Sequence, residues 1–147
     1  MAENIKLTKK VLNRTVFILS IIGVIIAVYV LYGFIKKTSI VCVNEGCEIV
    51  RKSPYSYPLG IPVPLVGLIG YFVLMILTFA RSVSQDLKLL KAILAIAVFG
   101  VLFVGWFTYT EIFYIKAVCT WCAISALNML IIFIIGLKMY QLERRTK

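Results

Sequence analysis

The chain has 147 residues, of which 62% are hydrophobic and 15% charged, and its formal net charge is +10. A water-soluble domain of this composition would expose more apolar surface than such proteins tolerate, so the composition predicts a protein surrounded by lipid. The length allows one membrane domain over residues 1–147 and no second folded domain. The basic residues form short clusters between apolar runs, without the aromatic interleaving of a nucleic-acid-binding surface, so no nucleic-acid partner is expected.

Four uncharged stretches are each long enough to cross a bilayer core, which needs about 20 helical residues. They cover residues 15–35, 61–80, 92–110 and 117–137. Each stretch is continuously apolar rather than alternating, which excludes a transmembrane barrel and predicts helices, because a helix satisfies its own backbone in lipid. The predicted fold class is therefore an all-α membrane protein, a bundle of four transmembrane helices.

Lysine and arginine are distributed unevenly over the segments outside these stretches. If the N-terminus lies inside, eleven of the 16 basic residues lie on its side and five on the other. Because short cytoplasmic segments carry the excess of positive charge, both termini are expected in the cytoplasm of a cell-membrane protein. Residues 36–60 and 111–117 are then outer loops, and residues 138–147 are a basic tail at the inner leaflet.

The prolines are confined to one part of the chain, from the first outer loop to the start of the second stretch: Pro54, Pro58, Pro62 and Pro64. Proline fixes its own φ, lacks an N–H and disfavours helix at the preceding residue. The first outer loop is therefore predicted to be irregular and stiff where it meets the second span.

All four cysteines fall on the predicted outer side of the bundle. Cys42 and Cys47 lie in the first outer loop, which contains Gly46 and can bend toward solvent or toward the bundle. Cys119 and Cys122 form a C-x-x-C at the start of the fourth stretch, where the helix dipole favours the thiolate. Because the outer face is oxidising, this clustering favours thiol and disulfide exchange.

Other uses of the cysteines are open at this point. A four-cysteine zinc site would need both pairs on one ion, although two spans separate them and the chain has no histidine. No metal is therefore expected. Two inert disulfides in a structural membrane protein or small transporter are the main alternative function. Cysteines used only for packing would be spread through the spans.

The combination of these motifs resembles the vitamin K epoxide reductase family. The matching features are the loop pair Cys42 and Cys47, Ser53 six positions later, the segment from Tyr57 to Gly67, and the C-x-x-C that opens the last span. A DsbB-type oxidase, which shares four helices and a quinone, has its C-x-x-C in the first outer loop, so the order of the pairs here is the reverse.

The resemblance implies a thiol:quinone oxidoreductase that supports disulfide formation. A separate secreted thioredoxin-like (DsbA-like) protein would be oxidised at Cys42, since no fused thioredoxin-like domain is expected in this chain. Cys47 would then attack Cys119, and Cys122 would reduce a quinone of the ubiquinone or menaquinone type. Ala126 occupies the position of a tyrosine in the vertebrate enzymes, which favours quinone reduction over epoxide reduction.

Four residues are candidates for quinone binding. The resemblance places the Ser53 hydroxyl near a quinone carbonyl, where it could stabilise developing charge. Tyr57 and Trp121 belong to a group of aromatic residues near Cys122, although an interfacial aromatic belt would have the same composition. Asn128 lies nearly two turns after Cys122 and could bond to a ligand or between helices. Glu111, at the mouth of the third span, is expected to be a solvated carboxylate.

Overall fold

The computed structural model describes residues 1–146, which form four long helices and no strand. The long helices are α1 (Ala2–Lys36), α3 (Val63–Val83), α4 (Leu87–Thr110) and α5 (Thr120–Arg145). Each is long and apolar enough to cross a membrane, α4 together with the helical turn η3 (Glu111–Ile115) that continues it. The predicted four-helix membrane bundle is confirmed.

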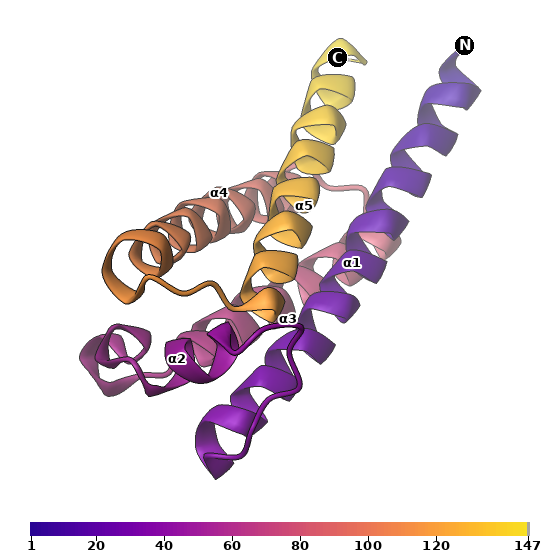
Figure 1. Ribbon diagram of the computed structural model, residues 1–147. Coiled ribbons are helices and arrows are strands. Elements are labelled where there is room, and N and C mark those ends of the chain that lie inside the picture. The colour runs from indigo at the N-terminus through magenta and orange to yellow at the C-terminus, as the bar shows by residue number, and fades with distance from the viewer. Residues whose placement is uncertain (147) are drawn as a thin grey trace.

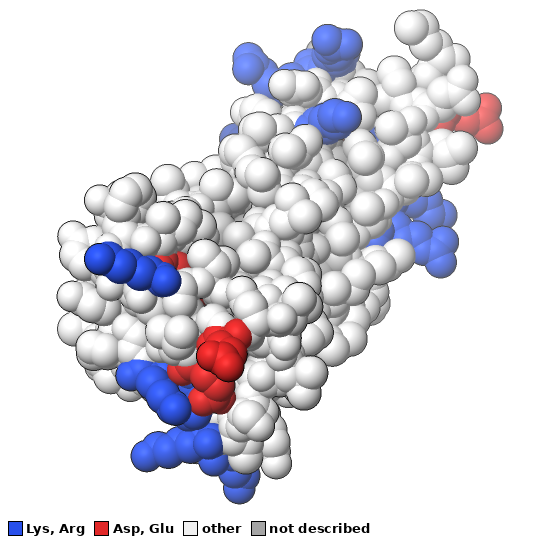
Figure 2. Space-filling model, viewed as in Figure 1, with Lys and Arg blue, Asp and Glu red and all other residues white. Residues whose placement is uncertain are grey.

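The two termini lie at the same end of the bundle, as Figure 1 shows. Lys9 of α1 and Glu143 of α5 form an ion pair there, with 3.2 Å between nitrogen and oxygen. We call this the terminal end, and the opposite end, around Cys47 and Cys119, the cysteine end. On the face shown in Figure 2, charged side chains gather toward the two ends and leave an uncharged surface between them. This distribution is typical of a bundle whose middle contacts lipid.

The helices extend beyond the uncharged stretches that predicted them. α1 begins at Ala2, and α5 continues to Arg145, so the expected basic tail is helical over most of its length. α3 begins directly after Pro62 and accommodates Pro64 in its first turn. A proline is tolerated there because first-turn N–H groups have no partner within the helix.

The bundle core has two parts. The larger part fills the middle and the terminal end, with fully buried side chains from all four long helices: Val16, Tyr71, Leu74, Leu90, Ile93 and Ile132. The second part fills the cysteine end and includes Val30, Phe34, Val50, Phe107, Cys47 and Cys119. The loop cysteine Cys47 therefore belongs to the packed interior, and the first loop bends toward the bundle.

The first loop contains a short helix that the sequence did not predict. α2 (Gly46–Lys52) begins one residue before Cys47, and the 3₁₀ turns η1 (Pro54–Ser56) and η2 (Pro58–Gly60) follow it. Within α2, Arg51 donates to both carboxylate oxygens of Glu48, at 2.7 and 3.2 Å. The proline-rich part is irregular as predicted, whereas the cysteine-bearing part is helical.

The terminal end is tied together by buried polar side chains. Arg81 of α3 is fully buried, and its Nη2 lies 3.4 Å from the Glu143 carboxylate of α5. Asn13 of α1 donates to the Thr78 carbonyl of α3 at 3.0 Å. These contacts join three of the four spans.

Candidate active site

Three of the four cysteine sulfurs meet at the cysteine end. Cys42 and Cys47 form a disulfide, whereas Cys119 and Cys122 are free thiols. The Sγ atoms of Cys47 and Cys119 are 2.9 Å apart, and both residues are only 1% exposed. Cys42, the disulfide partner of Cys47, and Cys122, the second cysteine of the C-x-x-C, are each partly exposed. A thiolate on Cys119 is therefore in contact with the sulfur that it would attack in a disulfide exchange.

The backbone just before Cys42 is held between α1 and α5. Trp121 donates its Nε1 proton to the Val41 carbonyl at 2.8 Å, and the Val41 N–H donates to the Tyr29 hydroxyl at 3.1 Å. The rings of Tyr29 and Trp121 pack edge to face, with their centroids 5.2 Å apart. Both backbone polar groups of Val41 thus have fixed partners on the bundle.

The segment after Cys42 is held by a second set of contacts. Asn44 donates to the Val118 carbonyl at 3.4 Å and accepts from the Thr120 hydroxyl at 3.2 Å. Gly46 packs so closely on the Val118 carbonyl that a Cβ atom there would clash with it. The residues on both sides of Cys42 are therefore seated on α1 and on the start of α5.

Cys119 occupies the N-cap position of α5. The hydrogen bond with the Cys122 thiol, helped by the N–H groups of Trp121 and Cys122, lowers the pKa of the Cys119 thiol to about 7. At neutral pH a large share of Cys119 is then thiolate, the form that attacks disulfides. Of the two free thiols, Cys119 is therefore the better nucleophile for exchange with the loop disulfide.

Glu111 lies directly against this pair of thiols. Its side chain is buried, with 1% exposed, and its Oε1 accepts from the Cys119 N–H at 3.3 Å. The Cys122 thiol lies beside the same carboxyl group. The expectation of a solvated carboxylate is wrong, because the π-helical turn η3 and the left-handed Lys116 lead the chain back over Glu111 toward α5.

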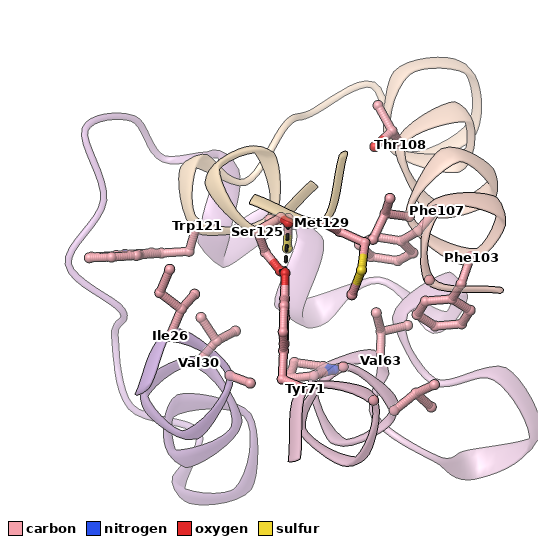
Figure 3. A pocket seen from close by; sticks show the side chains of 18 of the residues that line it. Ile26, Val30, Val63, Tyr71, Phe103, Phe107, Thr108, Trp121, Ser125 and Met129 are labelled. Carbon is pink, nitrogen blue, oxygen red and sulfur yellow. Dashed lines mark hydrogen bonds between the residues drawn. The ribbon is translucent and has the colours of Figure 1, made fainter. Parts of the chain in front are cut away.

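An apolar cavity begins at Cys122 and lies between all four long helices. Its volume is about 90 Å³, and most of its wall consists of aliphatic and aromatic side chains. Figure 3 shows Tyr71 pointing from α3 toward Ser125 of α5, and the Tyr71 hydroxyl donates to the Ser125 carbonyl at 2.8 Å. Phe99, which lines the cavity, is 60% exposed, so the cavity reaches the lipid-facing side of α4.

The four predicted quinone-binding residues lie in different places. Trp121 lines the cavity, whereas Ser53, Tyr57 and Asn128 are not among its described lining residues. Ser53 accepts from the Tyr55 N–H at 3.3 Å in the loop. Tyr57 packs on Phe34 with a centroid distance of 5.6 Å, and Asn128 donates to the Leu19 carbonyl at 3.0 Å. Their roles in quinone binding stay predictions.

Three polar residues that line the cavity were not predicted from the sequence: Tyr71, Thr108 and Ser125. Each lies inside or beside an apolar stretch, where it was counted as part of the span. A hydroxyl within a membrane helix needs a hydrogen-bond partner, and this could have singled out Tyr71.

The cysteine cluster also has the size of a metal site. One sulfur each from Cys42, Cys47 and Cys119 lies within 4.8 Å of the others. Two of the three are joined in a disulfide, however, so Cys119 is the only member of this trio with a thiolate to offer in this redox state.

A comparison with models of protein families identifies the family of this chain. A model of the vitamin K epoxide reductase family matches residues 14–137. The chain belongs to the vitamin K epoxide reductase family. The matched region contains all four cysteines, Glu111 and the cavity, and it confirms the resemblance inferred from the motifs. A comparison with curated proteins found no match.

Family membership gives the general class of activity. Members of the vitamin K epoxide reductase family are membrane oxidoreductases that work with disulfides and quinones. This chain is therefore an oxidoreductase, with a disulfide and two thiols gathered at one end of a membrane bundle.

Proposed function

We propose that this chain is a thiol:quinone oxidoreductase that oxidises a separate secreted thioredoxin-like protein and passes the electrons to a membrane quinone. One observation carries the proposal. The sulfurs form an unbroken series from Cys42, which is partly exposed, through Cys47 and Cys119 to Cys122 on the cavity wall. An apolar cavity with few polar groups suits a lipid-soluble quinone of the ubiquinone or menaquinone type.

The electron transfer proceeds by thiol and disulfide exchange. The donor dithiol attacks Cys42 and leaves as a disulfide, so that Cys42 and Cys47 become thiols. Cys47 then attacks Cys119 in a Cys119–Cys122 disulfide and releases the Cys122 thiolate. Attack of Cys42 on Cys47 restores the loop disulfide and frees Cys119. The dithiol of Cys119 and Cys122 reduces the quinone to quinol and becomes a disulfide again, so two electrons and two protons are transferred per cycle.

The redox state of the structure corresponds to one step of this cycle. The loop disulfide is formed while Cys119 and Cys122 are reduced, so the electron pair resides on the two cysteines nearest the cavity. This is the state that would reduce a bound quinone.

The orientation follows from charge and chemistry together. With both termini in the cytoplasm, eleven of the 16 basic residues lie inside, as positive-inside topology requires. The cysteine end then faces the oxidising exterior, where a secreted dithiol protein can reach Cys42.

The competing function is a membrane scaffold or small transporter with two inert disulfides. The free thiols of Cys119 and Cys122 and the contact between Cys119 and Cys47 favour exchange over inert staples. Inert staples would also need no thiol on a cavity wall.

The test is quinol formation in a single turnover by protein in lipid nanodiscs, under anaerobic conditions, with a reduced thioredoxin-like donor. We expect wild type to form quinol and Cys122→Ala to form none. Cys42→Ala should fail with the protein donor but retain activity with a small dithiol, which can reduce Cys119 and Cys122 directly. Ser84→Ala, in the α3–α4 connection, is the control and should match wild type. Equal rates of quinol formation in all variants would show that the cysteines form only structural disulfides.

A further inference from the structure

Glu111 is a buried carboxyl group without a cationic partner. It is 1% exposed, and among the described residues no lysine or arginine forms an ion pair with it. Burial of a carboxylate away from both water and a counter-charge is unfavourable. Ionisable groups kept inside membrane bundles are therefore commonly functional.

The backbone fixes the place of this carboxyl group. Glu111 opens the π-helical turn η3, and its own carbonyl accepts from the Ala117 N–H at 3.2 Å. Isolated π turns occur often at functional sites. This turn directs the side chain to the Cys119 N–H and the Cys122 thiol, so two elements hold the carboxyl against the pair of free cysteines.

The other groups near the cysteine end are poorly suited to carrying protons from these thiols. The chain has no histidine. The Glu48 carboxylate is held by Arg51 at 2.7 Å, and Lys52 and Lys116 are exposed. The Tyr71 hydroxyl is engaged with Ser125. Oxidation of a dithiol by a quinone nevertheless requires both thiol protons to leave sulfur, inside a largely apolar site.

We propose that Glu111 is the proton carrier of the Cys119–Cys122 pair, accepting a proton from a thiol and delivering it toward the quinone. This role rests on the proposed quinone reduction. The Cys122 thiol gives its proton to the Glu111 carboxylate and becomes a thiolate. A sulfur–sulfur bond then forms between Cys119 and Cys122, and the electron pair passes to the quinone. The Cys122 proton reaches one quinol oxygen by way of Glu111. The other quinol oxygen takes the Cys119 proton, or a proton from water where Cys119 is already a thiolate.

A purely structural role for Glu111 makes a different prediction. As a cap on the N-terminus of α5, the side chain needs only an acceptor for the Cys119 N–H. Glutamine at this position retains such an acceptor and nearly the same shape, but it cannot carry a proton. The Glu111→Gln variant therefore separates capping from proton transfer.

The experiment compares wild type with Glu111→Gln, Glu111→Asp and the matched control Glu45→Gln, an exposed carboxylate at the same end of the bundle. Quinol formation in a single turnover should fall on the order of a hundredfold in Glu111→Gln, the usual contribution of a positioned acid–base group. The deficit should shrink as the pH is raised, because water and hydroxide then take over the proton. Glu111→Asp should recover part of the rate, and Glu45→Gln should match wild type.

A second measurement needs no quinone. Small thiol and disulfide reagents switch Cys119 and Cys122 between dithiol and disulfide while infrared difference spectra are recorded. In wild type and Glu45→Gln, oxidation of the dithiol should produce the C=O stretch of a protonated carboxyl, because the Cys122 thiol proton then moves to Glu111. Glu111→Gln should lack this band.

The outcomes distinguish a failure of the proton-carrier role from a failure of the proposed quinone reduction. A rate deficit in Glu111→Gln that is the same at every pH, or a wild-type rate, would overturn the proton-carrier role. Absence of the carboxyl band from wild type would overturn it as well. If wild type shows the band but forms no quinol, quinone reduction fails while proton exchange between Glu111 and the thiols stands.

Discussion

Among the described residues, each end of the bundle has one charged side chain that is no more than 1% exposed, Arg81 at one end and Glu111 at the other, but the two are compensated in opposite ways. At the terminal end, Arg81 is paired with Glu143, and the helices around it are regular. At the cysteine end, Glu111 contacts a backbone N–H and thiols, and the elements around it are a π turn, a short helix and two 3₁₀ turns. Charge compensation marks the first site as a structural tie, whereas the uncompensated carboxyl beside reactive sulfur marks the second as chemical.

This comparison implies that stability and exchange can be changed separately. The exchange step can be isolated in a Cys122→Ser background, where attack of Cys119 on Cys47 forms a mixed disulfide and releases the Cys42 thiol. Capture of that thiol by a maleimide, followed by mass spectrometry, gives the exchange rate. Serine at position 122 retains a hydroxyl that can donate to Cys119.

The largest effect is expected at the terminal end. Arg81→Ala removes a fully buried side chain that joins α3 to α5, and should lower the free energy of unfolding by about 3 kcal/mol. Thermal unfolding in nanodiscs measures this loss, with the exposed Arg144→Ala as control. The exchange rate below the unfolding temperature should be unchanged. A variant with normal stability but slow exchange would break the division between the two ends.

At the cysteine end, the largest expected effect is on exchange. In Gly46→Ala, the added methyl group meets the Val118 carbonyl, and the loop must shift away from α5. Overpacking of about 2 kcal/mol corresponds to a fall in the exchange rate on the order of thirtyfold. Gly105→Ala, where a Cβ has open space, is the matched control. Normal exchange in Gly46→Ala would show that the seated loop is not needed for sulfur contact.

The pH dependence of exchange should follow the Cys119 thiol. Its pKa is lowered to about 7, first by the hydrogen bond with Cys122, so the reactive thiolate increases as pH rises through 7. Between pH 6 and pH 8 the exchange rate should rise about tenfold, in proportion to the thiolate fraction. Replacement of Cys122 by alanine removes the donor and should move the rise to higher pH. A flat profile would identify a step other than thiolate attack as limiting.

The sequence predicted the regular parts of this molecule better than the parts that do chemistry. Long uncharged stretches predict spans because lipid leaves the backbone no other partner, and the same stretches placed Cys119 and Cys122 at a helix start. The burial of Glu111 could not be predicted from the sequence, because a carboxylate at the end of an apolar run gives the same sequence pattern whether it faces water or the bundle. α2 was missed for a related reason, since its helix depends on packing of Cys47 and Val50 against the bundle.

The smallest effect tests the loop contacts at their exposed edge. Thr120→Val keeps the shape of the side chain but removes the hydroxyl that donates to Asn44 at 3.2 Å. Because this bond is exposed to solvent, its loss should destabilise the seated loop by about 0.5 kcal/mol and slow exchange about twofold. Thr8→Val, at the terminal end, is the matched control and should leave exchange unchanged. A fall in the exchange rate as large as that in Gly46→Ala would mean that this single hydrogen bond, rather than the close packing of Gly46 on Val118, holds Cys47 against Cys119.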